Sequence, residues 1–304
     1  MHYDRIPEPA PDLFTAPLKR PAGVGDDWLE PAQRRYGEDE HAVWDELYAR
    51  QMRVLPNRAI PQFFDGLERL NLGAGGVPDF TALSARLADM TGWSVVPVPM
   101  LIPDHVFFYH LANKRFPAGN FIRSRAQIDY IQEPDVFHDV FGHVPLLTDQ
   151  RYADHMQAYG KGGWKALKHN RLKALGAIYW YTVEFGLMNT PEGLRIYGAG
   201  ILSSAQESVF ALEGRSPNRL HLSIDRVMRT DYVISDLQQS YFVIDDFDEL
   251  LRVTVDRPFD MIYPRLQPGF QYSPGAVLEI DRVYHYGTQE YALRGGRGSN
   301  AAAI

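Results

Sequence analysis

Residues 133–145 read EPDVFHDVFGHVP, and this stretch decides the fold around it. His138 and His143 stand five positions apart among acids and aromatics. Pro134 and the acids beside it favour the start of a helix, whereas Gly142 favours its end. On one continuous α-helix, residues five apart point about 140° away from each other. We therefore expect a chain reversal at Gly142 to bring the two imidazoles together.

A third candidate ligand lies in the apolar stretch 178–186, which reads IYWYTVEFG. Glu184 is its lone acid, and a buried carboxylate is costly unless it is paired or coordinates a metal. Two His and one carboxylate form the facial triad of non-haem Fe(II) oxygenases. They also describe catalytic zinc sites, although the H-E-x-x-H spacing of the zincins is absent. The residues alone leave iron, zinc and a purely structural role open.

Three motifs together resemble the catalytic core of the pterin-dependent aromatic amino acid hydroxylases, in their short bacterial form. They are residues 135–147, the run YWYTVEFG at 179–186 and the run YGAGILSS at 197–204. The likeness extends from about residue 99 to about residue 264. It implies a mainly α fold with short β strands, one catalytic domain, and a monooxygenase that uses Fe(II), tetrahydropterin and O₂.

The resemblance also implies roles for individual residues. His138, His143 and Glu184 match the iron ligands of that family. The positions that match its pterin contacts are Ile102, Asp104, Phe107, Asp139 and Tyr179. Animal members carry Ser at the position of Asp104 and Glu at that of Asp139. Because Asp is one methylene shorter, we expect a water-bridged contact between Asp139 and the pterin.

Substrate recognition in the resemblance centres on a guanidinium, because a carboxylate is bound best by a bidentate Arg. The matching substrate-binding positions are Arg123, Pro134, Trp180, Gly200 and Ser203. Trp180 stands where tryptophan hydroxylases carry Phe, and Ile234 is apolar where tyrosine hydroxylases carry Asp. The resemblance therefore favours hydroxylation of L-phenylalanine to L-tyrosine over a tryptophan or tyrosine substrate. The nearby Arg125 is expected to be solvated.

Two hypotheses from other classes remain at this stage. A zinc-dependent hydrolase would use the same three ligands with Asp139 as the base, and it would need neither O₂ nor pterin. A non-catalytic helical binding protein would fill a polar core with the triad and would keep its function after Glu184→Ala.

Composition narrows the partners. The chain has 304 residues, a net charge of −7 and no Cys. This charge disfavours nucleic acid and anionic membranes as partners, and the lack of Cys excludes a disulfide framework. The N-terminus lacks a signal-peptide pattern, and no stretch approaches the roughly 20 apolar residues of a membrane span. The composition favours a cytoplasmic protein. Residues after about 264 show no heptad to match the tetramerisation helix of the animal relatives, so the resemblance implies a monomer that binds a small-molecule substrate.

The chain divides by composition into an extended N-terminal arm at 1–38, a catalytic domain at 39–290 and a disordered tail at 291–304. Helical periodicity begins near Glu38, and the glycine-rich segment 73–76 reads as a linker. Further helices are expected at 104–113, 134–141, 150–160, 165–188, 203–213 and 236–254. Strands are expected within 93–102 and near 271–280 and 283–286.

Overall fold

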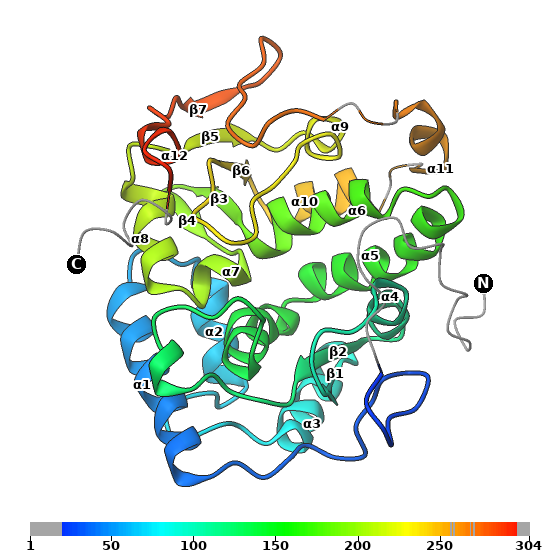
Figure 1. The fold of residues 1–304 in the computed structure, drawn as a ribbon, viewed down its shortest axis with the longest axis vertical. Helices are drawn as coiled ribbons and strands as arrows, with labels where there is room; N and C mark the ends of the chain where they lie inside the picture. Colours follow the sequence, from blue (N-terminus) through cyan, green and yellow to red (C-terminus); the bar gives the residue numbers. More distant parts are fainter. Residues whose placement is uncertain (1–19, 256, 258, 268, 270, 297–304) are drawn as a thin grey trace.

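The computed structural model describes residues 20–296, apart from 256, 258, 268 and 270 (Figure 1). Helices dominate, and the strands are short, with no more than five residues each. The expected mainly helical class with short strands is confirmed. No helix within the described ranges is long and apolar enough to cross a membrane.

Four helices form the first part of the chain. An apolar face packs each into the core, and local signals set the ends: the Asp79 carboxylate caps one start, and Gly92 in the left-handed region ends that helix. The glycine-rich segment 73–76 is a loop, as expected. The helices are α1 (Glu38–Val54), α2 (Pro61–Arg69), α3 (Phe80–Thr91) and α4 (Asp104–Ala112).

The long helix α5 packs against α4 and against the later helices α6, α10 and α11 (Figure 1). The helices after α4 are α5 (Gln150–Lys168), α6 (Leu172–Tyr179), α7 (Ala199–Leu202), α8 (Ala205–Glu213), α9 (Ile224–Val227), α10 (Phe247–Thr254), α11 (Phe259–Ile262) and α12 (Glu290–Leu293). Residues 137–143 and 180–184 are π-helical, and short 3₁₀ turns occupy 125–127, 144–148 and 263–265.

Two small sheets complete the fold. In the first, β1 (Ser94–Val98) and β2 (Arg115–Gly119) pair in parallel. The second has the order β4-β3-β6-β5-β7 and combines parallel and antiparallel pairs. Its strands are β3 (Gly186–Thr190), β4 (Gly193–Ile196), β5 (Asn218–His221), β6 (Ser240–Ile244) and β7 (Val283–His285). Strand β3 starts two residues after Glu184, so the sheet fixes the chain where it leaves that residue.

Several expected elements differ from the structure. The helix expected at 165–188 is divided, because α5 ends at Lys168 and the chain enters β3 at Gly186. The helix expected at 236–254 is wrong in its first half, where the buried run SYFVI forms the central strand β6. A short apolar run of this kind cannot be assigned by periodicity alone. The described part of 271–280 forms only an isolated bridge, between Tyr272 and Thr230.

The described part of the N-terminal arm, residues 20–37, contains neither helix nor strand. It is nevertheless fastened to the body: Trp28 is buried, and the backbone N–H of Glu30 donates to the carbonyl of Pro97 at 3.0 Å. His110 on α4 hydrogen-bonds the Asp27 carbonyl at 2.7 Å. At the other end, α12 continues to Leu293, so the tail expected from 291 begins with ordered residues. Residues 1–19 and 297–304 lie outside the description, and the domain boundaries stay predictions.

Burial of His155 on α5 makes stability depend on pH. The side chain is fully buried and hydrogen-bonds Thr254 Oγ1 at 2.9 Å, and burial lowers its pKa to about 3. Since the unfolded chain binds a proton below about pH 6.5 and the folded chain does not, the free energy of unfolding falls as the pH drops from about 6.5 toward 3. Between pH 7 and pH 5 we expect His155 to contribute a loss of about 2 kcal/mol.

Urea unfolding of the protein without metal at both pH values measures this loss. In His155→Gln the loss of unfolding free energy between pH 7 and pH 5 should be smaller by the about 2 kcal/mol that His155 contributes. An identical pH dependence in wild type and variant would show that the His155 imidazole is not the titrating group.

Candidate metal centre

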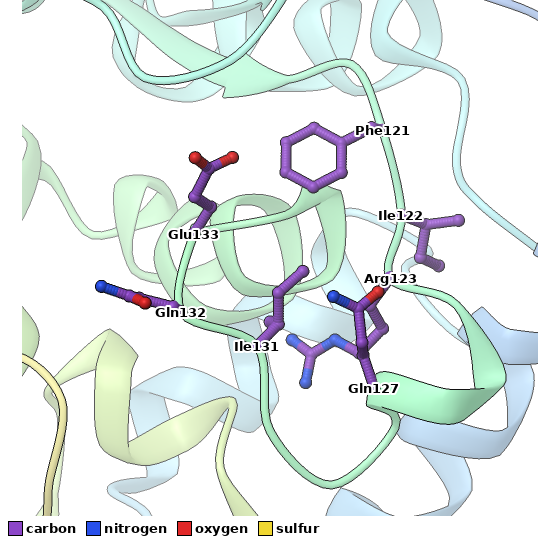
Figure 2. Close-up of a pocket in the computed structure, with 7 residues that line it drawn as sticks. All are labelled: Phe121, Ile122, Arg123, Gln127, Ile131, Gln132 and Glu133. Carbon is purple, nitrogen blue, oxygen red and sulfur yellow. The ribbon is translucent and has the colours of Figure 1, made fainter.

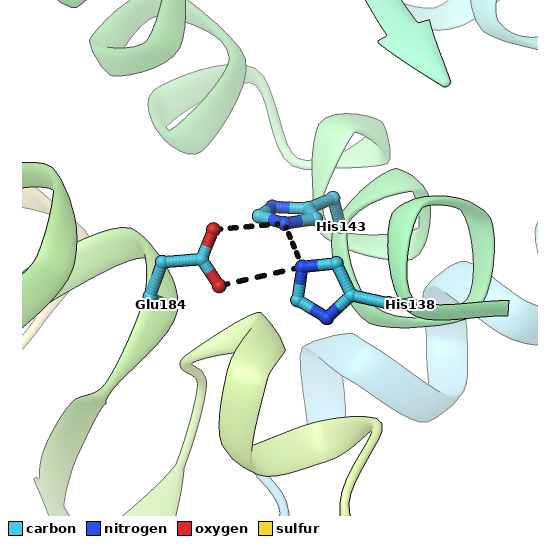
Figure 3. A group of neighbouring side chains, drawn as sticks. All are labelled: His138, His143 and Glu184. Atoms are coloured by element: carbon cyan, nitrogen blue, oxygen red, sulfur yellow. Dashed lines mark hydrogen bonds and ion pairs between the residues drawn. The ribbon is translucent and has the colours of Figure 1, made fainter. Parts of the chain in front are cut away.

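The side chains of His138 and His143, from one helical segment, converge with that of Glu184 from a later segment of the chain (Figure 3). The Nε2 atoms of His138 and His143 lie 3.3 Å apart. Glu184 places one carboxylate oxygen 3.2 Å from His143 Nε2 and the other 3.6 Å from His138 Nε2. Bonds of about 2.1 Å to one ion, at angles between 90° and 110°, would separate ligand atoms by roughly 3.0 to 3.4 Å. The spacing therefore suits a shared metal ion.

The two imidazoles meet by a route that the sequence argument did not anticipate. Residues 137–143 form a π-helix, in which hydrogen bonds span five residues, so His138 and His143 lie on nearly the same face. The expected chain reversal at Gly142 is wrong, because this residue is not in the left-handed region. Gly142 matters for its size: a Cβ there would lie 2.9 Å from the Ala199 carbonyl oxygen. A 3₁₀ turn at 144–148, which contains Pro145, follows the π-helix directly.

Ser203 orients the first imidazole. Its Oγ lies 2.9 Å from His138 Nδ1 and donates its own proton to the Ala199 carbonyl at 2.8 Å. The hydroxyl must therefore accept from Nδ1–H, which leaves the His138 Nε2 lone pair free for a metal. Burial lowers the pKa of His138 to about 4, so the imidazole is neutral at physiological pH. Ser203 was expected beside the substrate, and this contact with a ligand is a role that sequence reasoning missed.

Glu184 ends a second π-helix, residues 180–184, in which Phe185 N–H donates to the Trp180 carbonyl at 2.9 Å. Burial alone would raise the pKa of Glu184, but the imidazoles of His143 and His138 outweigh it and lower the pKa. The carboxylate is thus ionised and ready to bind a cation. Gly200 lies against it, because a Cβ at Gly200 would sit 3.2 Å from Glu184 Oε2.

A buried ion pair stands beside the centre. The Arg123 guanidinium donates to both carboxylate oxygens of Asp135, from Nε at 2.8 Å and from Nη2 at 2.9 Å. Asp135 Oδ1 also accepts the backbone N–H of His138 at 3.1 Å, so it caps the π-helix. Burial would raise the pKa of Asp135, but Arg123 outweighs it and lowers the pKa. Sequence reasoning considered Asp135 only as a helix-start signal and missed this pairing.

Arg123 also reaches a surface pocket of about 220 Å³ (Figure 2). The pocket is formed by the segment that joins Arg123 to the metal-binding helix, and it is lined by Phe121, Ile122, Arg123, Gln127, Ile131, Gln132 and Glu133. Pro134, expected on the wall of the substrate slot, follows this segment and is half-buried. Arg125 is largely exposed, as expected, and it pairs with Glu46 of α1 at 2.7 Å.

Trp180 stands on the other side of the centre, held by three neighbours. Its indole stacks on Tyr232, with ring centroids 4.7 Å apart, and packs on Phe185 at the same distance. Its Nε1–H donates to the amide oxygen of Gln238 at 2.8 Å. None of these three neighbours was identified from the sequence, although Phe185 adjoins Glu184 in the recognised motif. Together they fix an aromatic wall near the metal ligands.

Comparison with known proteins decides the family. Residues 31–266 match the model of the biopterin-dependent aromatic amino acid hydroxylases. The chain belongs to this family. A phenylalanine-4-hydroxylase of Caulobacter vibrioides is 54% identical over 93% of this chain and 96% of that protein.

Solved structures of phenylalanine hydroxylase from Chromobacterium violaceum agree with this fold. One, with iron and phenylalanine bound, shares 48% identity and a TM-score of 0.81, covering 85% of this chain and 94% of that one. Another holds Fe(III) and 7,8-dihydrobiopterin, with a TM-score of 0.82 and 48% identity over 89% of this chain and 100% of that one. The chain is therefore a pterin-dependent non-haem iron hydroxylase, and His138, His143 and Glu184 are its candidate iron ligands.

Two of the residues expected to face the pterin, Tyr179 and Phe107, lie beside the candidate iron ligand His143. The ring of Tyr179 stacks over His143 with centroids 6.1 Å apart, and it meets Phe107 edge-on at 5.6 Å. Phe107 is half-buried on α4, so it presents surface to a ligand. Tyr179 thus contacts both His143 and Phe107, the residue predicted to stack on the pterin. Their direct contacts with a pterin stay predictions.

The remaining predicted pterin contacts border the same region. Asp139 is nearly buried, and its Oδ2 accepts the backbone N–H of Gly119 at 2.7 Å. Burial raises the pKa of Asp139 to about 7, so a modest change of surroundings decides its charge. Asp104 begins α4, and Ile102 lies in the loop before it. Their contacts with a pterin are likewise predictions.

Removing the Ser203 hydroxyl should weaken metal binding. In Ser203→Ala the His138 Nδ1–H loses its acceptor, and losses of such orienting partners cost about 10- to 100-fold in metal affinity. Titration of the metal-free protein with Co(II), followed by absorbance, measures the affinity. Ser208→Ala is a matched control, since that buried hydroxyl donates to the Ile201 and Ser204 carbonyls and touches no ligand. Equal affinities in the two variants would contradict the orienting role.

Removing the Asp135 carboxylate should destabilise the fold as well as the site. Asp135→Ala leaves the buried Arg123 guanidinium unpaired, which costs about 3 to 5 kcal/mol. Urea unfolding of the metal-free protein measures this change. Asp149→Ala supplies a comparison. The Asp149 carboxylate is paired with the partly exposed Arg151, so its removal should lower the free energy of unfolding by only about 1 kcal/mol. Similar losses of unfolding free energy at both positions would show that the buried Arg123–Asp135 pair stabilises the fold no more than the more exposed pair does.

Proposed function

We infer that this chain is a phenylalanine 4-hydroxylase, converting L-phenylalanine to L-tyrosine with O₂, Fe(II) and a tetrahydropterin. The observation that carries the inference is the convergence of His138, His143 and Glu184 beside a buried guanidinium and an aromatic wall. The phenylalanine-4-hydroxylases at about 50% identity support it. Tryptophan and tyrosine hydroxylation are the alternatives within the family.

The residues present fit an iron ion. The donor set of two imidazole nitrogens and one carboxylate is that of the facial triad, which leaves coordination positions open. His138 is neutral and correctly oriented by Ser203, and Glu184 is ionised. When bound, Fe(II) and tetrahydropterin together supply the reducing power that splits O₂, placing one oxygen atom on the substrate ring and one on the pterin.

The protein's part is to hold the substrate ring against the open side of the metal. Arg123 would bind the substrate carboxylate with the N–H groups that Asp135 leaves free, and Asp135 fixes the guanidinium for that purpose. Trp180 would face the ring, with its indole held by Gln238 and Tyr232. Pro134 would form the opposite wall. Fixing both ends of the substrate determines which ring carbon faces the metal.

Selectivity for phenylalanine rests on fewer observations. Ile234, apolar where tyrosine hydroxylases carry Asp, lies with its side chain 61% exposed in the loop that follows Tyr232. An apolar residue there offers no hydrogen bond to a substrate hydroxyl. A site that lacks this bond has no means of preferring tyrosine.

A zinc-dependent hydrolase gains no support from the geometry. Asp139 would have to act as its base, yet one of its carboxylate oxygens, Oδ2, already accepts the Gly119 N–H at 2.7 Å. The expectations of a monomer, a cytoplasmic location and a catalytic domain at 39–290 stay proposals. They are supported by the composition and by the family match.

The decisive experiment loads the purified protein with Fe(II) without oxygen and then adds phenylalanine, tetrahydropterin and O₂. We expect tyrosine, detected by chromatography, only when iron and pterin are both present. Glu184→Gln and His143→Ala should reduce it to the iron-free background, because each removes a metal ligand.

Tryptophan and tyrosine are offered in parallel, and zinc loading is the control. Preferred turnover of either amino acid would overturn the substrate assignment. Hydrolytic activity with zinc in the absence of O₂ would overturn the reaction.

A further inference from the structure

Residues 287–296, called here the C-terminal strap, lie beyond residue 266, where the family match ends. In Figure 1 this segment, which contains α12, lies near α8 and β7. Hydrogen bonds fasten it to the chain between α8 and β5. They run from Gly287 N to Asn218 Oδ1 at 2.8 Å, from Thr288 N to Arg215 O at 2.9 Å, from Gln289 N to Ser216 O at 2.9 Å and from Tyr291 N to Ser216 Oγ at 2.9 Å.

From this anchor the strap reaches the loop at residues 231–239. The Tyr291 hydroxyl donates to Asp236 Oδ1 at 2.7 Å. The Gln289 side chain donates to the Gln239 carbonyl at 3.0 Å. Gly296 packs so closely on Asp236 that a side chain at this position would overlap the carboxylate. The strap therefore holds the loop at its middle and at its end.

The same loop supports Trp180, the indole proposed to face the substrate ring. Gln238 is almost fully buried; its amide nitrogen donates to the Asp236 carbonyl at 3.1 Å, and its amide oxygen accepts from Trp180 Nε1 at 2.8 Å. Tyr232, at the start of the loop, stacks on Trp180. A path of direct contacts thus runs from Tyr291 through Asp236 and Gln238 to the indole.

Hydrogen bonds and one edge-on ring contact, between Tyr291 and Phe210 with centroids 5.4 Å apart, hold the strap here. A cavity of about 290 Å³ lies between the strap and the end of α8, lined by Phe210, Gly214, Arg215, Ser216, Glu290, Tyr291, Arg294 and Gly296. The exposed tip of the loop, Ile234 and Ser235, has little apolar contact to fix it. Segments with few buried apolar contacts open locally at low cost, so each hydrogen bond has a large share in their position.

We propose that Tyr291 is a positioning residue for substrate recognition: through Asp236 it holds the loop at 231–239, and with it Trp180, in the arrangement that receives the aromatic amino acid. This inference deepens the proposed function and rests on it for the kinetic outcome. Tyr291 itself touches neither ligands nor substrate. Its loss should therefore affect binding of the amino acid and leave the metal and pterin sites unchanged.

The test compares Tyr291→Phe with wild type in two measurements. Hydrogen exchange of the metal-free protein, read by mass spectrometry, should show about fivefold faster exchange in peptides covering 231–239 and unchanged exchange in those covering 133–145. Steady-state kinetics should show a KM for phenylalanine raised about three- to tenfold, with kcat and the KM for pterin within twofold of wild type.

Matched variants separate positioning from general destabilisation. Tyr286→Phe removes a hydroxyl from a largely exposed tyrosine of the neighbouring segment and should change neither measurement. Asp236→Asn keeps an acceptor oxygen and should resemble wild type. Asp236→Ala should resemble Tyr291→Phe, and combining the two should add little to Asp236→Ala alone.

Three outcomes would overturn the proposal. One is unchanged exchange at 231–239 in Tyr291→Phe, and another is faster exchange throughout the chain. The third is a proportional change of kcat and of both KM values. If wild type did not hydroxylate phenylalanine at all, the proposed function would fail, and the exchange measurement would still decide whether the strap holds the loop.

Discussion

The π-helix at residues 137–143, whose backbone hydrogen bonds span five residues, is the constraint on which the site depends. An α-helical turn would direct His138 and His143 away from each other, and one imidazole would leave the metal. A π-helix places them on nearly one face without breaking the chain, with His143 buried and His138 half-buried. The same device recurs at 180–184, where it delivers Glu184 to the centre before the chain enters β3. Both turns are rare and cost helix regularity. The ligand set they assemble explains their presence.

Asp135 connects this metal-binding turn to the substrate side of the site. One carboxylate caps the π-helix at His138 and holds the Arg123 guanidinium. The positions of the metal ligands and of Arg123, the residue proposed to bind the substrate carboxylate, are therefore set by the same group, which is itself fully buried. In the proposed function this arrangement would fix the distance between the substrate's charged end and its ring, a quantity that decides regioselectivity. It also makes Asp135 a residue in which stability and function cannot be separated.

Much of the site could be predicted from the sequence because its signals are chemical. Two His and a lone acid in an apolar run indicate candidate metal ligands whatever the local geometry, and the flanking motifs identify the family. The geometry itself was not accessible: Gly142 reads as a helix-ending signal, whereas it serves as a small residue under the Ala199 carbonyl. The central strand β6 was read as helix because the run SYFVI is apolar throughout and shows no period.

Two of the residues whose roles escaped prediction share a physical property: they act through a partner far away in sequence. Ser203 is recognisable only when its hydroxyl is seen to accept from His138, 65 positions earlier. Gln238 matters through Trp180, 58 positions earlier, and a buried Gln carries no chemical signal by itself. Side chains of this kind set orientation rather than supply reactivity. In this molecule the candidate reactive groups can therefore be recognised in short sequence motifs. The groups that orient them can be recognised only in the folded structure.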